Sequence, residues 1–396
     1  MRGRLLKARL HVLSPIHIGC DDVYEPSHFV IDKKNNILIN FDPLNFIKLL
    51  SPQEKQEITK ISMGETVESI LKIYEFISEK LALIKGIKKS INVDISSDLS
   101  MHYGKVLNPN NKNNRDKINN EINNFVINRT AFNPNNNLPY IPGSSLKGSF
   151  RTGYLNLISK NGTNNNFLDW KKNAEKIGEA DKKGAEKFEK KNKQLEENLL
   201  GGRFDSDPFS MVKVSDFIPV ENVKTRILYA VIKNKKMPNP KKAPRGPSQI
   251  LEIIDEGSIF EGVININNPE YGQKIKKPID LGNILNALNK FYKNDFKKES
   301  DEVLKKIDAS LDSYNIYNNK YKGNFNRGCF VRIGRHSGAE AVTIEGVRKI
   351  KIMQKNGESP KYLEHTTRIW LASEESKPKT NKGLLPFGWA ILEILE

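Results

Sequence analysis

Residues 137–157, which read NLPYIPGSSLKGSFRTGYLNL, decide how the N-terminal half of this 396-residue chain folds. The apolar run 138–141 ends at Pro142, and it is expected to be extended because the residue before a proline disfavours the helical backbone. Ser144 then stands where a helix N-cap belongs, ahead of helix-compatible residues. Apolar residues recur behind it at helical spacing and predict a buried helix face: Leu146, Phe150 and Leu157.

A second face of the predicted helix is polar and basic. Ser144, Lys147 and Arg151 follow one another at i, i+3 and i+7. Two cations four residues apart repel by about 0.2–0.5 kcal/mol on an isolated helix, and a bound anion would relieve that repulsion. The N–H groups and positive dipole end of a helix N-terminus suit a phosphate. Small residues, Gly143, Ser145 and Gly148, leave room for a nucleic-acid backbone. A helix start made of small residues with no ligand is the alternative, and the residues alone leave both open.

The charge of the chain points to a polyanionic partner. Lys and Arg total 64 against 47 acidic residues, which gives a formal charge of +17. Nucleic acid and an anionic membrane surface both fit this excess. No apolar run approaches the roughly 18 residues of a membrane span, and the N-terminus alternates like a strand rather than a signal peptide. Two cysteines make neither a disulfide framework nor a zinc site. We therefore expect a cytoplasmic protein without metal or cofactor.

The sequence on both sides of the predicted helix also predicts strands, helices and loops. Residues 4–13 alternate apolar and polar, which predicts a half-buried strand that the turn SPIHIG, residues 14–19, breaks. Residues 42–90 have helical spacing. Residues 159–202 are rich in Lys, Glu, Asn and Gly, and within them 175–197 is expected to be a solvated charged helix or a disordered segment, not a core element. Two loops rich in asparagine are expected at 108–124 and 315–326.

A glycine-rich loop near the C-terminus is the third notable feature. Gly334 and Gly338 bracket Arg335 and His336 directly after the apolar strand pattern 329–333. Glycine permits positive φ angles and close backbone approach. Arg335 and His336 can meet phosphates or base edges. We therefore include them among the candidate nucleic-acid-binding residues.

The segment IPGSSLKGSFRT, residues 141–152, resembles the signature of the RAMP superfamily, the RRM-like RNA-binding subunits of CRISPR effector complexes. The turn 14–19 and the glycine-rich loop 334–338 are similar to two further features of that family. The resemblance implies an α+β fold with two ferredoxin-like (RRM-like) domains, the second degenerate. The first is expected at 1–270, with a helical insertion at about 42–136 and a charged insertion at about 159–205, and the second at 271–396.

The long insertion is similar to that of the subunit that caps the backbone filament in type III-A (Csm) complexes. Loop residues 20–26, CDDVYEP, do not reproduce the aspartate that the repeated backbone subunit uses to cut target RNA. The resemblance therefore implies a non-catalytic subunit at the 3′-end side of the CRISPR guide RNA (crRNA). Its partners would be crRNA, the repeated backbone subunit, the small helical subunit and host nucleases that trim crRNA during maturation. The implied RNA-binding residues are His17, Gly143, Ser144, Ser145, Lys147, Arg151, Arg335 and His336.

A second function of a different class stays open. In a metal-independent endoribonuclease that cuts CRISPR precursor RNA, His17 would be the general base, because an imidazole titrates near neutral pH. Lys147 would stabilise charge in the transition state. The sequence carries no P-loop, HExxH, paired CxxC or GxSxG motif that would indicate another chemistry. We favour the non-catalytic subunit, because family members that cut precursor RNA are usually shorter and lack the insertion.

Overall fold

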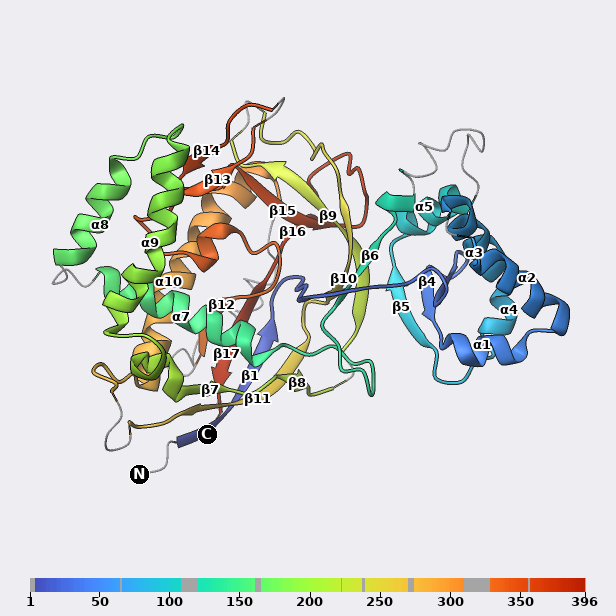
Figure 1. Ribbon diagram of the computed structural model, residues 1–396, viewed down its shortest axis with the longest axis horizontal. Coiled ribbons are helices and arrows are strands. Elements are labelled where there is room, and N and C mark those ends of the chain that lie inside the picture. Colours follow the sequence, from blue (N-terminus) through green and yellow to red (C-terminus); the bar gives the residue numbers. More distant parts are fainter. Residues whose placement is uncertain are drawn as a thin grey trace.

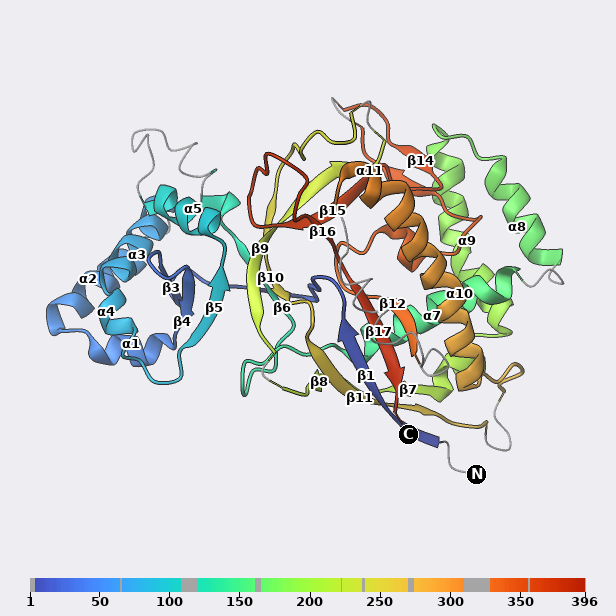
Figure 2. The same ribbon diagram turned by 180° about the vertical axis from the view of Figure 1, so that it is seen from behind.

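The computed structural model describes residues 4–395 except 65, 108–119, 121, 161–164, 222, 237–238, 270–273, 310–327 and 355–356. The expected loop at 315–326 and most of the loop at 108–124 lie outside the described residues. Figures 1 and 2 show two curled sheets with helices on one side of the molecule and a helical lobe at the other.

The first sheet, called sheet A below, has strand β1 (Arg4–Val12) at its centre. Its order is β12 (Gly328–Arg332), β17 (Trp389–Ile394), β1, β11 (Ile259–Ile266) and β7 (Val212–Val214), and β8 (Ile218–Pro219) also pairs with β11. The neighbours of β1 on both sides run antiparallel to it. Side chains Leu6, Ala8, Leu10 and Val12 are buried and those between them are not, so the predicted half-buried strand is confirmed.

Helices α7 (Gly143–Lys160) and α10 (Leu281–Glu299) pack together against sheet A (Figure 1). They approach closely at Gly153, where an added Cβ would lie 2.9 Å from Leu288. Leu146 and Phe150 are buried as predicted. Two details of the prediction were wrong: the helix begins at Gly143 rather than after Ser144, and Leu155 rather than Leu157 continues the buried face.

The second sheet, sheet B, is mixed. Its order is β2 (Gly19–Val23), β6 (Ile127–Thr130), β10 (Gln249–Ile254), β9 (Thr225–Asn234), β5 (Ile91–Ile95), β4 (Ile37–Asn40) and β3 (Phe29–Asp32). Strand β15 (Arg368–Ser373) pairs with another part of β9, and β16 (Leu385–Pro386) pairs with β15. Each sheet therefore takes strands from both sides of residue 270, where the sequence predicted a domain boundary. That boundary stays a prediction.

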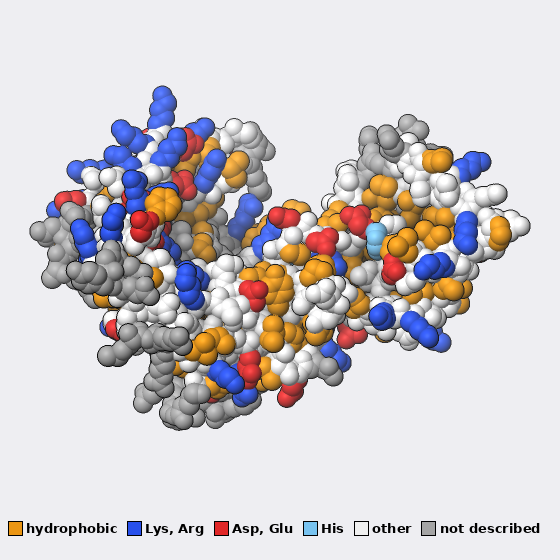
Figure 3. Space-filling view, turned by 60° about the horizontal axis from the view of Figure 1, so that its bottom comes forward, with side chains coloured by type: hydrophobic (Ala, Val, Ile, Leu, Met, Phe, Trp, Pro, Cys, Tyr) orange, Lys and Arg blue, Asp and Glu red, His pale blue; other side chains and the backbone are white. Residues whose placement is uncertain are grey.

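The predicted helices of residues 42–90 are confirmed. They are α1 (Pro43–Leu49), α2 (Pro52–Ser62), α3 (Val67–Glu79) and α4 (Leu81–Ile84), with α5 (Ser97–Leu107) after them. The first four pack with β3 and β4 around a separate core that includes Phe46, Phe76 and Ile84. Figure 3 shows the resulting lobe set off from the rest of the molecule by a hollow. The insertion at about 42–136 is not wholly helical, because it also contains β5 and β6. These two strands pair with β9 and β10 of sheet B.

The charged segment after α7 forms helices α8 (Asn165–Glu175) and α9 (Lys182–Leu200). We expected no core element here, and that expectation was wrong. Phe188, Leu195 and Leu199 of α9 are buried in the main core. They are few, but they share one face because they are spaced at i, i+7 and i+11. The lysines on the opposite face form the basic surface at the upper left of Figure 3.

Shorter elements complete the chain. Short 3-10 helices span Phe204–Ser206, Pro208–Met211 and Ala339–Val342, and a π-helical turn, Ser300–Leu304, joins α10 to α11 (Lys305–Ile307). Strands β13 (Ile350–Ile352) and β14 (Lys361–Leu363) form a hairpin. Strands β15 and β17 are the last long strands of the described chain, and each joins a different sheet. None of the described helices is long and apolar enough to cross a bilayer.

Candidate nucleic-acid interface

The start of α7 is built against the strand segment that follows β7. The N–H of Gly143 donates a hydrogen bond of 2.8 Å to Oδ1 of Asp216. A carboxylate at this position also interacts favourably with the helix dipole. An added Cβ at Gly143 would lie 2.2 Å from the carbonyl oxygen of Val214. Gly143 therefore has a packing role in this structure, and its N–H already donates a hydrogen bond to Asp216.

Two ammonium groups lie near each other beside this helix start. The pKa of Lys147 is lowered, first by partial burial and then by the charge of Lys213, with Asp207 opposing the shift and Arg151 adding to it. Neither Lys147 nor Lys213 has a side-chain hydrogen bond or ion pair within the described part of the chain. A phosphate placed between them would relieve their repulsion. Ser144 is exposed on the same turn of the helix, and Ser145 is half-buried.

Lys213 was missed from the sequence, although a signal was present. In β7 the neighbours Val212 and Val214 are more buried than Lys213, so the alternation directs the lysine toward solvent. The pattern does not reveal that this exposed lysine lies close enough to Lys147 to lower its pKa, because 66 positions separate them in the chain (213 minus 147).

Arg151 is already held by carboxylates of this chain. Its guanidinium forms ion pairs with Glu196 of α9 at 3.1 Å and with Asp207 at 2.7 Å. It also lies over the ring of Phe209, 5.5 Å from the centroid. These contacts give Arg151 a positioning role, because it joins α7 to α9 and to the segment before β7. Its predicted contact with RNA remains untested.

Gly148 differs from the other glycines of α7. It is exposed, and apart from its own stretch of helix no heavy atom of the described residues lies within 4 Å of the position of an added Cβ. A glycine inside a helix costs about 0.5–1 kcal/mol relative to alanine. Close packing compensates for this cost at Gly143 and Gly153. At Gly148 no contact with the described residues compensates for it. It stands next to Lys147, where a ligand could approach the helix backbone closely.

The turn after β1 and the glycine-rich loop meet at the junction of the two sheets. The N–H of Arg335 donates to the carbonyl of His17 at 2.8 Å. Gly334 has φ +85, and an added Cβ there would lie 2.6 Å from the same carbonyl oxygen. The N–H of Gly388 donates to the carbonyl of Pro15 at 3.0 Å. Two of the three sequence features are therefore in contact.

The remaining sequence feature is the start of α7. The segment that leads into α7 connects it to this junction. The N–H of Ala131 donates to the carbonyl of Ile18, and the N–H of Tyr140 donates to the carbonyl of Ala131. Tyr140 precedes α7 by three residues (143 minus 140). The predicted site residues thus form two groups, one at the helix start and one at the loop junction.

His17 points into the protein. It is 1% exposed, and its Nδ1 lies 2.8 Å from the carbonyl oxygen of Glu252, while its Nε2 is buried and has no hydrogen-bond partner among the residues that the structure describes. Burial lowers the pKa of the ring, and the Glu252 carbonyl opposes this. Glu252 is itself buried, 3.8 Å from Arg129. In this conformation His17 shapes the turn and does not reach a ligand at the surface.

His336 and Arg335 differ in their exposure. Arg335 is exposed, and it has no side-chain partner among the described residues. His336 lies in the left-handed region with φ +67 and packs against Trp370 of β15, with ring centroids 4.4 Å apart and the rings tilted by 38°. Burial first, and then the charges of Arg335 and His17, lower the pKa of His336 to about 3. Arg335 is therefore the group of this loop that is free to meet an anion.

The protonation of His336 makes stability depend on pH. Folding lowers its pKa from 6.5 to about 3, so the unfolded chain binds more protons in that window and the free energy of unfolding falls as pH falls. We expect this residue to remove on the order of 1–2 kcal/mol between about pH 7.5 and about pH 5. His336→Asn suits the left-handed backbone and should flatten the dependence, measured by urea unfolding. Equal slopes in both proteins would contradict this.

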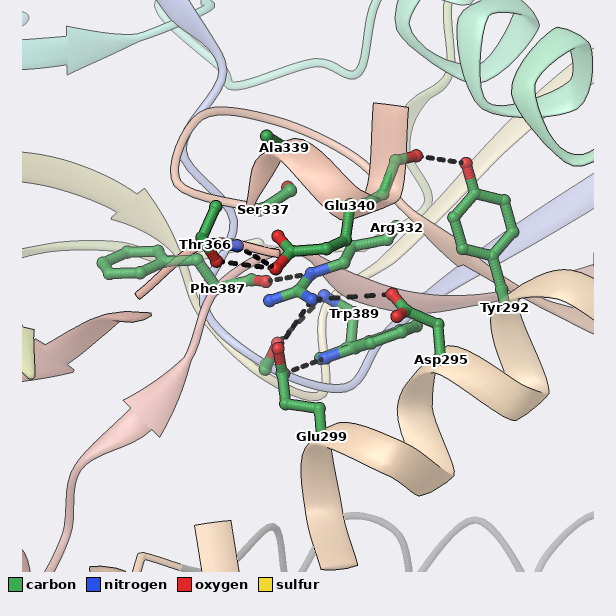
Figure 4. A network of polar contacts seen from close by, with 12 residues as sticks. Tyr292, Asp295, Glu299, Arg332, Ser337, Ala339, Glu340, Thr366, Phe387 and Trp389 are labelled. Atoms are coloured by element: carbon green, nitrogen blue, oxygen red, sulfur yellow. Dashed lines mark hydrogen bonds and ion pairs between the residues drawn. The ribbon is translucent and has the colours of Figure 1, made fainter. Parts of the chain in front are cut away.

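A buried polar network supports the glycine-rich loop from below (Figure 4). Arg332, whose side chain is 4% exposed, pairs with Glu299 of α10 at 2.7 Å and donates to the carbonyl of Phe387 at 3.1 Å. Its guanidinium lies 4.6 Å from the ring centroid of Trp389. The indole N–H of Trp389 donates to Glu299 at 2.9 Å. This network joins α10 to β12 and β17 at the base of the loop.

Two curled sheets, a helix pair packed on sheet A, and a glycine-rich loop closing on the turn after β1 define an α+β protein of the ferredoxin-like class. The model of the RAMP superfamily matches residues 9–337. The chain belongs to that superfamily.

Two curated relatives carry the name CRISPR system Cms protein Csm5. The one from Streptococcus thermophilus is 27% identical over 321 residues, which cover 79% of this chain and 77% of the relative. The one from Methanocaldococcus jannaschii is 27% identical over 227 residues, which cover 56% of this chain and 44% of the relative.

Two solved structures share the fold. A chain of the cryo-EM structure of a Csm–crRNA–target RNA ternary complex of a type III-A CRISPR-Cas system aligns with a TM-score of 0.62 at 18% identity, over 98% of this chain and 100% of that one. The crystal structure of T. onnurineus Csm5 aligns with a TM-score of 0.54 at 18% identity, over 97% and 99%. The predicted α+β fold with two ferredoxin-like domains and helical insertions is confirmed.

Proposed function

We propose that this chain is a RAMP subunit of a type III-A (Csm) CRISPR effector complex and holds the place of Csm5 there. It binds crRNA through the exposed face at the start of α7 together with Lys213 of β7. We call Ser144, Ser145, Lys147, Gly148 and Lys213 the helix-start face. The observation that carries this proposal is the pair of ammonium groups, Lys147 and Lys213, which have no side-chain partner among the described residues and lie next to a glycine with open space above it. Such a surface fits a phosphate backbone rather than bases.

The names of the relatives and of the similar structures support two kinds of partner. Csm5 relatives and a chain of a Csm–crRNA–target RNA complex support crRNA and other Csm subunits as partners. We further propose contacts with the repeated backbone subunit, with the small helical subunit and with host nucleases that trim crRNA, and a cytoplasmic location. The lobe of α1–α4 packs on the β4–β3 end of sheet B and stands away from sheet A (Figure 1), and it offers surface for neighbouring subunits.

Gly148→Ala tests the helix-start face. We expect the free energy of unfolding of this variant to be about 0.5–1 kcal/mol higher, because alanine favours a helix and its Cβ would meet no neighbouring side chain or segment in the described part of the chain. We expect its affinity for single-stranded RNA to fall several-fold, because the methyl group stands where the backbone of the ligand would lie. Urea unfolding and fluorescence anisotropy measure the two effects.

Two variants serve as controls for Gly148→Ala. Gly178→Ala also adds a methyl group in open space, but outside the helix-start face, and should leave affinity unchanged. Gly153→Ala should lower stability, because its Cβ would lie 2.9 Å from Leu288. Unchanged affinity in Gly148→Ala would place the RNA away from this face.

The subunit is proposed to be non-catalytic. The candidate base His17 is buried and held by a backbone carbonyl, which supports this proposal against the endoribonuclease. The purified chain should bind labelled CRISPR precursor RNA and leave it intact on a denaturing gel, with and without Mg²⁺. A defined cut that disappears in His17→Gln would make the chain a processing nuclease instead.

A further inference from the structure

Two basic loops far apart in the sequence are held together beside sheet B by one buried lysine. Loop 239–247 lies between β9 and β10, and loop 374–384 lies between β15 and β16. The ammonium group of Lys233, in β9, donates to the carbonyl of Lys242 in the first loop and to Oδ1 of Asn381, at 3.3 Å, in the second.

Asn381 completes the connection. It is buried, and its Nδ2 donates to the carbonyl oxygens of Lys241 at 2.9 Å and of Pro240 at 3.4 Å. Backbone carbonyls of the first loop therefore bind both Lys233 and Asn381. Because these groups are buried, the two loops keep a defined position relative to each other.

Lys233 occupies a core-facing position of its strand. It shares a strand face with Val231, which is buried in the main core, and Lys233 itself is 1% exposed. Its hydrogen-bond acceptors are a carbonyl and an amide oxygen, and no carboxylate pairs with it in the part of the chain that the structure describes. Burying an ammonium group without a counter-charge is costly. An external anion near the loops would offset part of that cost.

The outer surface of both loops is positively charged. Six cations are exposed and form no side-chain ion pair or hydrogen bond within the described ranges: Lys241, Lys242, Arg245, Lys377, Lys379 and Lys382. The second loop also carries Glu374 and Glu375, but Glu374 already pairs with Arg226 at 2.8 Å. The loops and Lys233 together therefore present a net positive charge that this chain does not neutralise.

We propose that loops 239–247 and 374–384 form a second RNA-backbone site, the two-loop site, which binds phosphates of single-stranded RNA apart from the helix-start face. The inference rests on the proposed function for the identity of its ligand. Lysine predominates in the site, and lysine binds phosphate as a point charge without reading bases. Because the loops are already joined by Lys233 and Asn381, less conformational freedom is lost on binding.

Neutralising each loop in the full-length chain tests the two-loop site. One variant carries Lys241→Gln, Lys242→Gln and Arg245→Gln, and another carries Lys377→Gln, Lys379→Gln and Lys382→Gln. The probe is a fluorescein-labelled single-stranded RNA, and anisotropy is measured over a series of salt concentrations. We expect each variant to lose about 10-fold in affinity at about 0.1 M salt, and the slope of log affinity against log salt to fall by about 2 for three lost contacts.

The control matches the lost charge. Lys187→Gln, Lys190→Gln and Lys191→Gln remove three exposed lysines of α9 and should change neither affinity nor slope. A further variant, Asn381→Ala, keeps every charge but removes the hydrogen bonds between the loops, so affinity should fall with the salt slope unchanged. Thermal unfolding checks that each variant is folded. The glutamine substitutions are at exposed positions and should leave the unfolding midpoint unchanged, whereas Asn381→Ala removes a buried amide and should lower it.

The outcomes separate this inference from the proposed function. If both loop variants bind RNA like the α9 control while Lys147→Gln/Lys213→Gln binds poorly, the two-loop site is wrong and the helix-start face stands. If the loop variants lose affinity and the helix-start variant does not, the RNA uses the two-loop site alone. Wild-type binding in all of them overturns both.

Discussion

Replacing Lys147 and Lys213 together by glutamine is expected to lower the affinity for single-stranded RNA by about 10- to 100-fold at about 0.1 M salt. The two ammonium groups lie close enough for Lys213 to lower the pKa of Lys147. A phosphate between them would gain two charge-assisted hydrogen bonds and relieve the repulsion. The salt slope should decrease by about 1.4, because each contact with a single strand contributes about 0.7. Fluorescence anisotropy at several salt concentrations measures both quantities.

The free energy of unfolding of the same double variant should rise slightly or stay unchanged. Without RNA the two lysines repel each other, and no described carboxylate pairs with either of them, so their removal costs the fold little. If both lysines hold one phosphate, the losses of binding free energy in the two single variants should not add up to the loss in the double variant. Fully additive effects would mean two separate phosphates. An affinity equal to that of Lys187→Gln/Lys190→Gln on α9 would remove the helix-start face as an RNA site.

Arg332→Met is expected to have the largest effect on stability, about 3–5 kcal/mol. The change leaves the carboxylate of Glu299 buried without its partner, and it also removes the charge that opposes the burial-raised pKa of Asp295. Because α10, β12 and β17 meet in this network (Figure 4), the glycine-rich loop above it should also lose order. Urea unfolding measures the loss of stability.

The double variant Arg332→Met/Glu299→Gln distinguishes the loss of a charge pair from the loss of packing. The introduced amide keeps an oxygen that can accept from the indole N–H of Trp389, but it carries no charge. The double variant should therefore be more stable than Arg332→Met alone. The loss in Arg332→Met should also be smaller at about pH 5 than at about pH 7.5, because an unpaired buried carboxylate takes up a proton more readily. Additive effects with no dependence on pH would show that packing dominates.

Local patterns predicted many of the elements around the site. The alternation of Leu6, Ala8 and Leu10 predicted β1, and helical spacing predicted α7 and the helices within 42–84. Both patterns depend on side chains a few positions apart, which is the distance over which a strand or helix repeats. The prediction for the charged segment was wrong because its apolar residues were judged by their number and not by their spacing, although Phe188, Leu195 and Leu199 share one face of α9.

The sequence by itself therefore determined the secondary structure around α7, the superfamily resemblance and the presence of cations near the helix start. Only the tertiary structure decided which of these cations are free. Arg151 is held by Glu196 and Asp207, which are 45 and 56 positions away, and Gly143 is capped by Asp216, 73 positions away. Lys213 comes to Lys147 through the pairing of β7 with β11. Charge pairing and burial depend on distance in space, and local periodicity carries no information about contacts between segments so far apart.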